Sequence, residues 1–201
     1  LSSGYTFSGG GTSESPYLIK SATDLARLAA NVNSGTNYHG KYFKLEANID
    51  LMGHEWTPIG NSSSKFEGIF DGNNKIITNM SITAAPSSDS GVGLFGNCSG
   101  ASVSNVVLKN AKITYSGEIG LYSGLICGVF SGAVKNCRVD GTISAKRECC
   151  GGIIGKANGG TSVSDCDVEI HGESPWGYTG GIVGYFHEDA QLTIESCVVK
   201  G

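Results

Sequence analysis

A two-part unit recurs through most of this chain and limits the folds that are open to it. The first part is a glycine followed by two apolar residues, and its five copies begin at Gly68, Gly93, Gly124, Gly152 and Gly181. The second part has apolar first, fourth and sixth positions, and its copies span 77–82, 103–108, 134–139, 163–168 and 194–199. The leading glycines lie 25 to 31 residues apart. A period of this length indicates a solenoid, a propeller or an array of repeats.

The content of the unit favours one of these architectures. Each part is short, rich in apolar and β-branched residues, and bounded by Gly, Asn, Ser and Asp, as β-strands are. No copy has helical periodicity over ten residues, and a propeller blade needs roughly 40 residues. We therefore expect an all-β fold, a parallel β-helix in which each strand pairs with its counterpart about 4.8 Å away in the next coil. The crossover rule for parallel strands predicts a right-handed solenoid.

In-register stacking predicts the core. The fourth positions of the second part would form one buried column, which comprises Met80, Val106, Cys137, Cys166 and Cys197. The first and sixth positions would form two more columns. Since the first and fourth positions have opposite parity, the polar third position is expected to bend the strand. The glycines that flank the first part predict tight corners with positive φ.

Composition and charge narrow the function. The chain has 201 residues, a net charge of −4, 31 glycines and 4 prolines, which is typical of a turn-rich β protein with one core. The mild acidity gives no electrostatic reason to bind nucleic acid. No apolar run is long enough for a membrane span, so membrane insertion is not expected. No cofactor is predicted.

The seven cysteines are expected to be structural. Their odd number excludes complete pairing within the chain. No C-x-x-C occurs, and the adjacent pair Cys149–Cys150 is a poor spacing for zinc, so no metal site is predicted. We expect the stacked cysteines to be small buried hydrophobes with their thiols intact, because parallel in-register side chains point the same way.

The N-terminal part differs from the repeats. Residues 1–65 are expected to form a cap and an irregular first coil, and residues 66–201 the regular repeats, in one continuous domain. Ser21 and Asp24 make a capping-box variant before a helix over 23–34, and Gly35 ends it. Its apolar face is Leu25, Leu28, Ala29 and Val32. We expect this helix to cover the open first coil; the alternative is a partner-binding helix.

Longer stretches resemble a known family. Residues 16–60 (PYLIKSATDLARLAANVNSGTNYHGKYFKLEANIDLMGHEWTPIG) and 66–82 (FEGIFDGNNKIITNMSI) resemble the N-terminal part of bacterial surface proteins with GLUG-motif repeats. The later GGIIG and GGIVGY units are similar to the GLUG repeats themselves. The resemblance implies a secreted or cell-surface location, as in adhesin-like proteins and the non-catalytic part of immunoglobulin A metalloproteases. The motif carries no catalytic residues. Cys127 departs from the pattern, because other copies have Gly or Asp at that place.

Motifs for catalysis are not found. His187-Glu188-Asp189 lacks the second histidine of a zinc protease motif, and no G-x-S-x-G occurs. A carbohydrate-processing β-helix would need clustered carboxylates, and the outward positions show no repeated acidic cluster. No catalytic residue is therefore assigned, and the chain is expected not to be an enzyme.

A binding surface is the remaining possibility. Trp176, Tyr178, Tyr185 and His187 are the candidate ligand-binding residues, since exposed aromatic rings stack on sugars or anchor protein partners. The alternative is that Trp176 and Tyr178 fold back over the coil as a lid.

These observations favour a secreted or surface-exposed module of a bacterial adhesin-like protein, a stiff spacer that binds a host or extracellular-matrix protein or glycan. The alternatives are an ancillary domain of a larger surface protease or carbohydrate-active enzyme, and a carbohydrate-processing β-helix in its own right. Since 194–199 is a core strand close to Gly201, we expect further repeats or a neighbouring molecule to cover that end.

Overall fold

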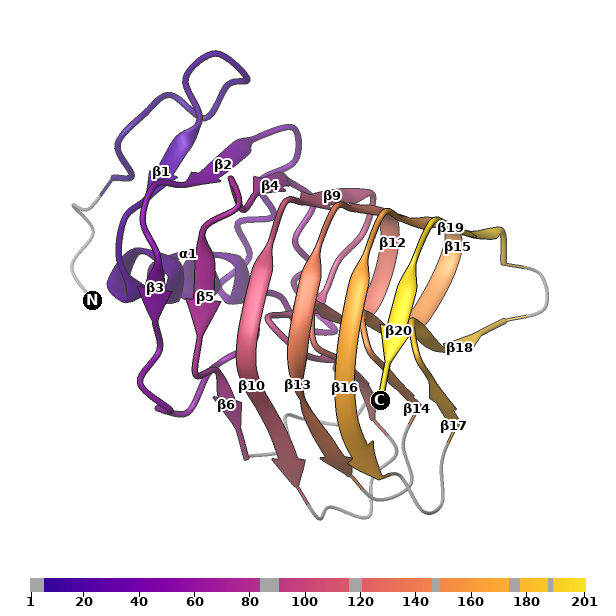
Figure 1. Ribbon diagram of the computed structural model, residues 1–201. Coiled ribbons are helices and arrows are strands. Elements are labelled where there is room, and N and C mark those ends of the chain that lie inside the picture. Colours follow the sequence, from indigo (N-terminus) through magenta and orange to yellow (C-terminus); the bar gives the residue numbers. More distant parts are fainter. Residues whose placement is uncertain (1–5, 84–90, 116–120, 146–148, 174–177, 188–189) are drawn as a thin grey trace.

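The computed structural model is a three-sided parallel β-solenoid with a helix at one end (Figure 1). It describes residues 6–83, 91–115, 121–145, 149–173, 178–187 and 190–201. In these ranges there are twenty strands and one helix, α1 (Ala22–Asn33). All pairings between named strands are parallel, each joining one coil to the next. The predicted parallel β-helix is confirmed.

The strands form three sheets that follow the solenoid axis. Sheet 1 contains β1 (Tyr17–Ile19), β2 (Tyr42–Leu45), β4 (Ile69–Asp71), β8 (Phe95–Asn97), β9 (Ala101–Ser104), β12 (Cys127–Lys135), β15 (Ile154–Ser164), β18 (Val183–Phe186) and β19 (Leu192–Glu195). Sheet 2 contains β3 (Ile49–Asp50), β5 (Ile76–Thr78), β6 (Ser81–Ile82), β10 (Val107–Tyr115), β13 (Arg138–Ala145), β16 (Asp167–Glu173) and β20 (Val198–Lys200). Sheet 3 contains β7 (Gly91–Val92), β11 (Tyr122–Gly124), β14 (Cys149–Gly151) and β17 (Tyr178–Gly180).

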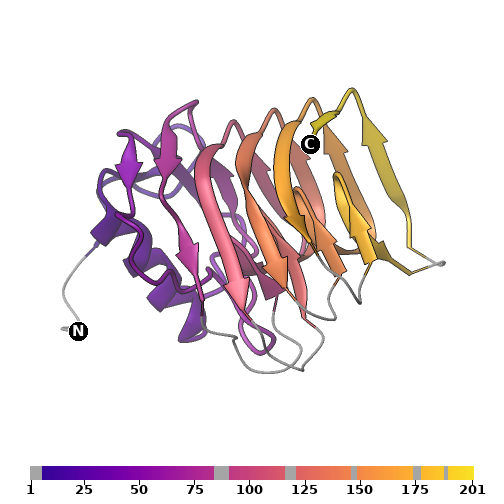
Figure 2. The ribbon, with the colours of Figure 1, turned by 60° about the horizontal axis from the view of Figure 1, so that its bottom comes forward.

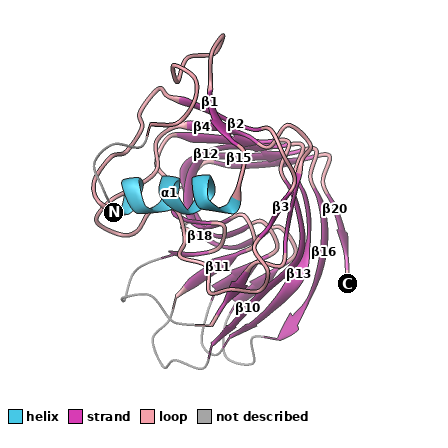
Figure 3. Ribbon diagram, turned by 90° about the vertical axis from the view of Figure 1, so that its left-hand side faces the viewer, coloured by secondary structure: helices cyan, strands magenta, loops and turns pink. Residues whose placement is uncertain are grey.

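The hand of the solenoid follows from the path of the chain. Seen from the N-terminal end, the chain crosses sheet 1, descends sheet 2 and returns through sheet 3 as it recedes from the viewer (Figure 3). This clockwise, receding path is right-handed, as the crossover rule predicts. Figure 2 shows the coils following one another along the axis from α1 to β20.

Equivalent residues of successive coils stack in the core. Val103, Val134, Val163 and Ile194 are register partners in sheet 1. Leu108, Val139, Val168 and Val199 are partners in sheet 2. Between these two columns, Val106, Cys137, Cys166 and Cys197 occupy the same place in four coils, because two residues separate the paired strands at each level. The first three of these side chains are fully buried.

Met80 does not belong to that column, so the predicted alignment of the first copy was wrong. Ile77 pairs with Leu108 rather than with Val103, and Phe70 is the partner of Val103. Met80 lies one corner further on, where its carbonyl accepts from the Lys112 N–H at 2.7 Å. The error has a physical origin, since both stretches are a strand, a left-handed Asn and another strand.

The glycine motif of the first copy was misplaced in the same way. Gly68 precedes β4, whose residues pair with the second part of the next unit. The true counterpart of the stretch around Phe95 contains Ile59, which bridges to it. In a later coil, Cys127 pairs with Phe95 and Ile154, and Gly128 follows it. Cys127 is therefore a buried core residue and does not replace a glycine of the motif.

Most glycines of the motif serve close approach rather than positive φ, which corrects the expectation from sequence. Gly124, Gly152 and Gly155 are not among the residues with positive φ. A Cβ on Gly155 would lie 2.4 Å from the Ser123 nitrogen, and one on Gly124 would lie 2.4 Å from the Cys127 carbonyl oxygen. Sheet 3 thus packs backbone to backbone against sheet 1, which only glycine permits.

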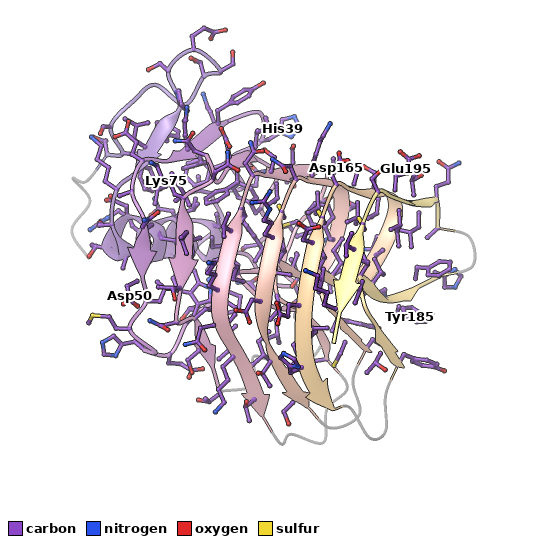
Figure 4. The ribbon with its side chains drawn as sticks, in the orientation of Figure 1. His39, Asp50, Lys75, Asp165, Tyr185 and Glu195 are labelled. Carbon is purple, nitrogen blue, oxygen red and sulfur yellow. The ribbon has the colours of Figure 1, made fainter. Side chains whose placement is uncertain are left out.

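The bend predicted at the third position is present. Asn105, Asn136, Asp165 and Ser196 have φ between 52° and 55°, the left-handed region that Asn and Asp tolerate best. Their side chains continue the stack: the Asn136 amide donates to Asn105 Oδ1 at 2.7 Å, and the Asn105 amide donates to Asp71 Oδ1 at 2.8 Å. Asp165 and Glu195 mark this edge of the solenoid in Figure 4.

Helix α1 covers the N-terminal end of the core (Figure 3). Ser21 is its N-cap and accepts from the Asp24 N–H at 3.2 Å, while Asp24 accepts from the Lys20 N–H at 2.9 Å. Leu25, Leu28, Ala29 and Val32 are buried as predicted. Asn33 ties the helix to the first coil, because its side chain donates to the Pro58 carbonyl and accepts from the Gly60 N–H.

The close contact of sheets 1 and 3 predicts the effect of two substitutions in one strand. Gly155→Ala forces a Cβ into the Ser123 backbone, so we expect the free energy of unfolding to fall by about 1–3 kcal/mol. Gly159→Ala, also in β15, meets nothing within 4 Å and should change it by less than about 0.5 kcal/mol. Urea denaturation of the two variants measures the difference. Equal stability of both would contradict the packing described.

The left-handed corner predicts a second pair of variants. Asn136→Gly and Asn136→Val both remove the hydrogen bond to Asn105, but valine strongly disfavours a φ of 52°. The valine variant should be less stable than the glycine variant by about 1–2 kcal/mol in urea denaturation. If the two unfold at the same urea concentration, the corner does not impose this conformation.

Candidate functional site

The candidate ligand-binding residues lie near the C-terminal coils. Tyr178 is in β17 and is 69% exposed, Tyr185 is in β18 and is half-buried, and His187 is exposed just after that strand. Figure 4 labels Tyr185 at this end of the molecule. Trp176 lies outside the described residues.

Two of these candidates, Tyr178 and Tyr185, lie close to residues that the sequence analysis did not identify. The Tyr178 and Tyr185 rings have centroids 6.2 Å apart, and the Tyr122 ring stacks on Tyr185 at 6.3 Å with an interplanar angle of 30°. The Lys156 Nζ lies 4.8 Å from the Tyr122 centroid and 5.9 Å from that of Tyr185. We call Tyr122, Lys156, Tyr178 and Tyr185 the tyrosine–lysine cluster.

Register explains this cluster. Tyr122 and Tyr178 hold the same position of sheet 3, two coils apart, with Cys149 between them. Lys156 and Tyr185 are register partners in sheet 1. When the glycine motif is aligned in the register of the structure, Tyr122 and Tyr178 fall in one column. The sequence therefore contained this relation, but the alignment used for the prediction did not reveal it. The cluster contributes cation–π contacts between the coils, worth about 0.5–1 kcal/mol each at exposed sites.

A second surface feature is an open groove of about 480 Å³ on the outer face of sheet 2. We call it the sheet-2 groove; it crosses β5, β10, β13, β16 and β20, the strands at the front of Figure 1. Apolar side chains of Ile76, Val107 and Val198 line it. Its charged lining residues are Lys109, Arg138, Asp140, Asp167, Glu169 and Lys200. Three positive and three negative groups leave the groove without net charge.

The charged residues of the groove stand in rows set by the register. Arg138 pairs in register with Asp167, and their Nε and Oδ2 atoms are 3.6 Å apart. Asp140 pairs with Glu169, which in turn pairs with Lys200. Along the solenoid axis, the first row therefore places a donor beside an acceptor, and the second row places two acceptors beside a donor. The sequence contained this pattern, but it becomes visible only once the strands are in register.

The cysteine column forms a buried thiol network. The Cys137 N–H donates to Cys166 Sγ at 3.5 Å. The thiol hydrogen bond to Cys166, together with burial, raises the pKa of Cys137 well above its usual value, and the same bond lowers the pKa of Cys166. Burial raises the pKa of Cys197. No disulfide joins any of the seven cysteines, all of which the structure describes.

The last coil leaves part of its core side open. Ile194 and Val199 are 43% and 46% exposed, whereas their partners Val163 and Val168 in the preceding coil are buried. Strands β18 and β19 pair with β15, and β20 pairs with β16, each along one edge.

Within the described ranges, no three His, Cys, Asp or Glu side chains are grouped so that they could hold a metal ion. No helix among the same residues is long and apolar enough to cross a membrane.

Comparison with known proteins gives distant relatives. No family model matches the chain. Halomucin from Haloquadratum walsbyi is 29% identical over 161 residues, which are 75% of this chain and 2% of that protein. A protein of Evansella cellulosilytica described as a "Putative Gly-rich membrane protein" is 34% identical over 142 residues, 67% of this chain and 16% of that protein. The chain thus spans a small part of the relatives it matches.

Among solved structures, the crystal structure of a "putative immunoglobulin A1 protease" from Bacteroides ovatus is similar with a TM-score of 0.59. The likeness covers 92% of this chain and 66% of that one at 22% sequence identity. At this identity the likeness shows a shared fold.

Burial predicts the order in which the cysteines react. Cys149 and Cys197 are partly exposed, whereas Cys98, Cys127, Cys137, Cys150 and Cys166 are buried. Iodoacetamide should alkylate Cys149 and Cys197 in the native protein, and the five buried thiols only after unfolding, as peptide mass spectrometry can measure. Early alkylation of Cys137 or Cys166 would contradict the buried column.

Proposed function

We propose that this chain is a non-catalytic solenoid module of a protein displayed outside the cell, where it acts as a stiff spacer and a binding surface for a host or matrix protein or glycan. The observation that carries the proposal is the continuous parallel stack, in which three sheets run the length of the molecule around one core. Such a module sets a fixed distance between whatever stands at its two ends.

Stiffness follows from how the coils are joined. Strands β10, β13 and β16 each pair on both sides, and sheets 1 and 3 repeat this on the other faces. Bending the axis would stretch hydrogen bonds in one sheet and compress the side-chain columns behind another. A closely packed core resists both, because its side chains have no voids into which to move.

An extracellular location is supported by resemblance rather than by geometry. The GLUG-like units point to secreted or wall-attached bacterial proteins, and the Evansella relative carries the words membrane protein in its description. Since the chain matches only 2% and 16% of the two relatives, adhesin activity and its ligands are part of the proposal.

The exposed end of the last coil supports a further element of the proposal. We infer that a coil in the same parallel register covers Ile194 and Val199 in the assembled protein, because strand edges and apolar side chains favour such an addition. Helix α1 covers the core at the other end of the stack.

Antibodies against this chain test the location. Intact, unpermeabilised cells of the source organism should be labelled, and mild protease treatment of the same cells should remove the label. An antibody against a ribosomal protein is the control and should label permeabilised cells only. Labelling that appears only after permeabilisation would contradict the proposed location.

Two further outcomes separate the alternatives. A zinc-protease motif in the same polypeptide would favour an ancillary role in a surface protease. Cleavage of a polysaccharide by the chain itself would contradict the non-catalytic assignment, and would point to the facing carboxylates Asp140 and Glu169.

A further inference from the structure

We propose that the sheet-2 groove binds a neutral, linear oligosaccharide that lies along the solenoid axis, across the strands. This inference rests on the proposed function, because it names a ligand class and a place for the binding surface. The place differs from the aromatic residues that the sequence had suggested.

The shape of the groove favours an elongated ligand. It is lined by residues of five strands, from Ile76 in β5 to Val198 and Lys200 in β20. Four strand spacings of about 4.8 Å make its length about 19 Å. Its volume of about 480 Å³ is in the range of small-ligand sites, but it is spread along this length rather than gathered in a pocket. A chain of several sugar rings fits such a site better than one compact molecule.

The spacing of the strands across the groove disfavours a peptide. Side chains on one face of an extended peptide recur about every 6.6 Å, which does not match the spacing of about 4.8 Å between neighbouring strands of the groove. The inner strands β10, β13 and β16 also have both backbone edges paired, so a peptide on this face cannot add to the sheet by main-chain hydrogen bonds.

The charges of the groove disfavour ionic polymers. Its three cationic and three anionic side chains balance, so neither a polyanion nor a polycation gains from a net field. Lys109 and Lys200 can donate hydrogen bonds, and Asp140 and Glu169 can accept them. Hydroxyl groups both donate and accept, so a sugar chain can pair with these lysines and carboxylates without carrying charge.

The apolar residues complete the match. Val107 and Val198 lie in the same row as Arg138 and Asp167, on either side of that ion pair. Sugar rings have C–H faces that pack on aliphatic side chains, while their edges carry the hydroxyls. The groove therefore offers apolar contact beside hydrogen-bond donors and acceptors, the combination usual in small-ligand sites.

Nuclear magnetic resonance titration of the chain tests the proposal. The probes are cellohexaose, xylohexaose, mannohexaose and maltohexaose, with hexagalacturonate and chitosan hexamer as charged comparators. We expect at least one neutral hexasaccharide to bind, to shift the amide signals of Val107, Arg138, Asp167 and Val198, and to bind at least tenfold more tightly than either comparator. The disaccharide of the same sugar should bind more weakly than the hexasaccharide, because it contacts fewer strands of the groove.

Two variants locate the site. Asp140→Ala removes an acceptor of the groove and should weaken binding about tenfold or more, as expected for hydrogen bonds to charged groups. Glu195→Ala removes a carboxylate of the same charge from sheet 1 and should change the affinity less than twofold. Circular dichroism shows whether both variants keep the fold.

Several results would overturn the inference. These are the failure of all four neutral hexasaccharides to bind, signal shifts confined to Tyr122, Lys156 and Tyr185, or equal loss of affinity in the two variants. Tighter binding of a charged comparator would also overturn it. None of these results alters the labelling of intact cells, so failure of the groove and failure of the proposed location are distinguishable.

Discussion

Backbone hydrogen bonding between equivalent strands of successive coils is the interaction on which the rest of this structure depends. Each strand finds its partner one repeat away in sequence, so an identical position in the unit becomes an adjacent position in space. Columns of Val, Leu and Cys side chains, stacked Asn amides and rows of surface charge all follow from that rule. The helix at the N-terminal end closes the stack, because without it the first coil would expose its core to water.

Most of the fold could be predicted from the repeat, but the register of its irregular parts could not. The second part of the unit aligned correctly from Val103 onward, because strand, left-handed corner and strand recur there without insertion. The first copy failed because Asn79 makes the same kind of corner one side further on, where its side chain accepts from Asn110. Local sequence records the shape of a corner but not which of the solenoid's corners it is.

The glycines show the same limit in another form. Their recurrence correctly indicated a constrained backbone. However, glycine is required both where φ is positive and where two backbones approach closely, so the sequence does not distinguish these two causes. Only the positions of neighbouring coils distinguish them, as at Gly155 against Ser123. The candidate site was affected likewise: Tyr178 and Tyr185 were found as exposed aromatics, whereas Tyr122, Lys156 and the sheet-2 groove required the register between coils.

Equivalent residues of successive coils are in contact throughout this stack, and methyl nuclear Overhauser spectroscopy measures such contacts. We expect strong cross-peaks between Val134 and Val163 and between Val163 and Ile194, which are register partners. No cross-peak is expected between Val103 and Ile194, because three strand spacings, about 14 Å, separate them. Missing cross-peaks between the partners, or contacts between Val103 and Ile194, would contradict the stack.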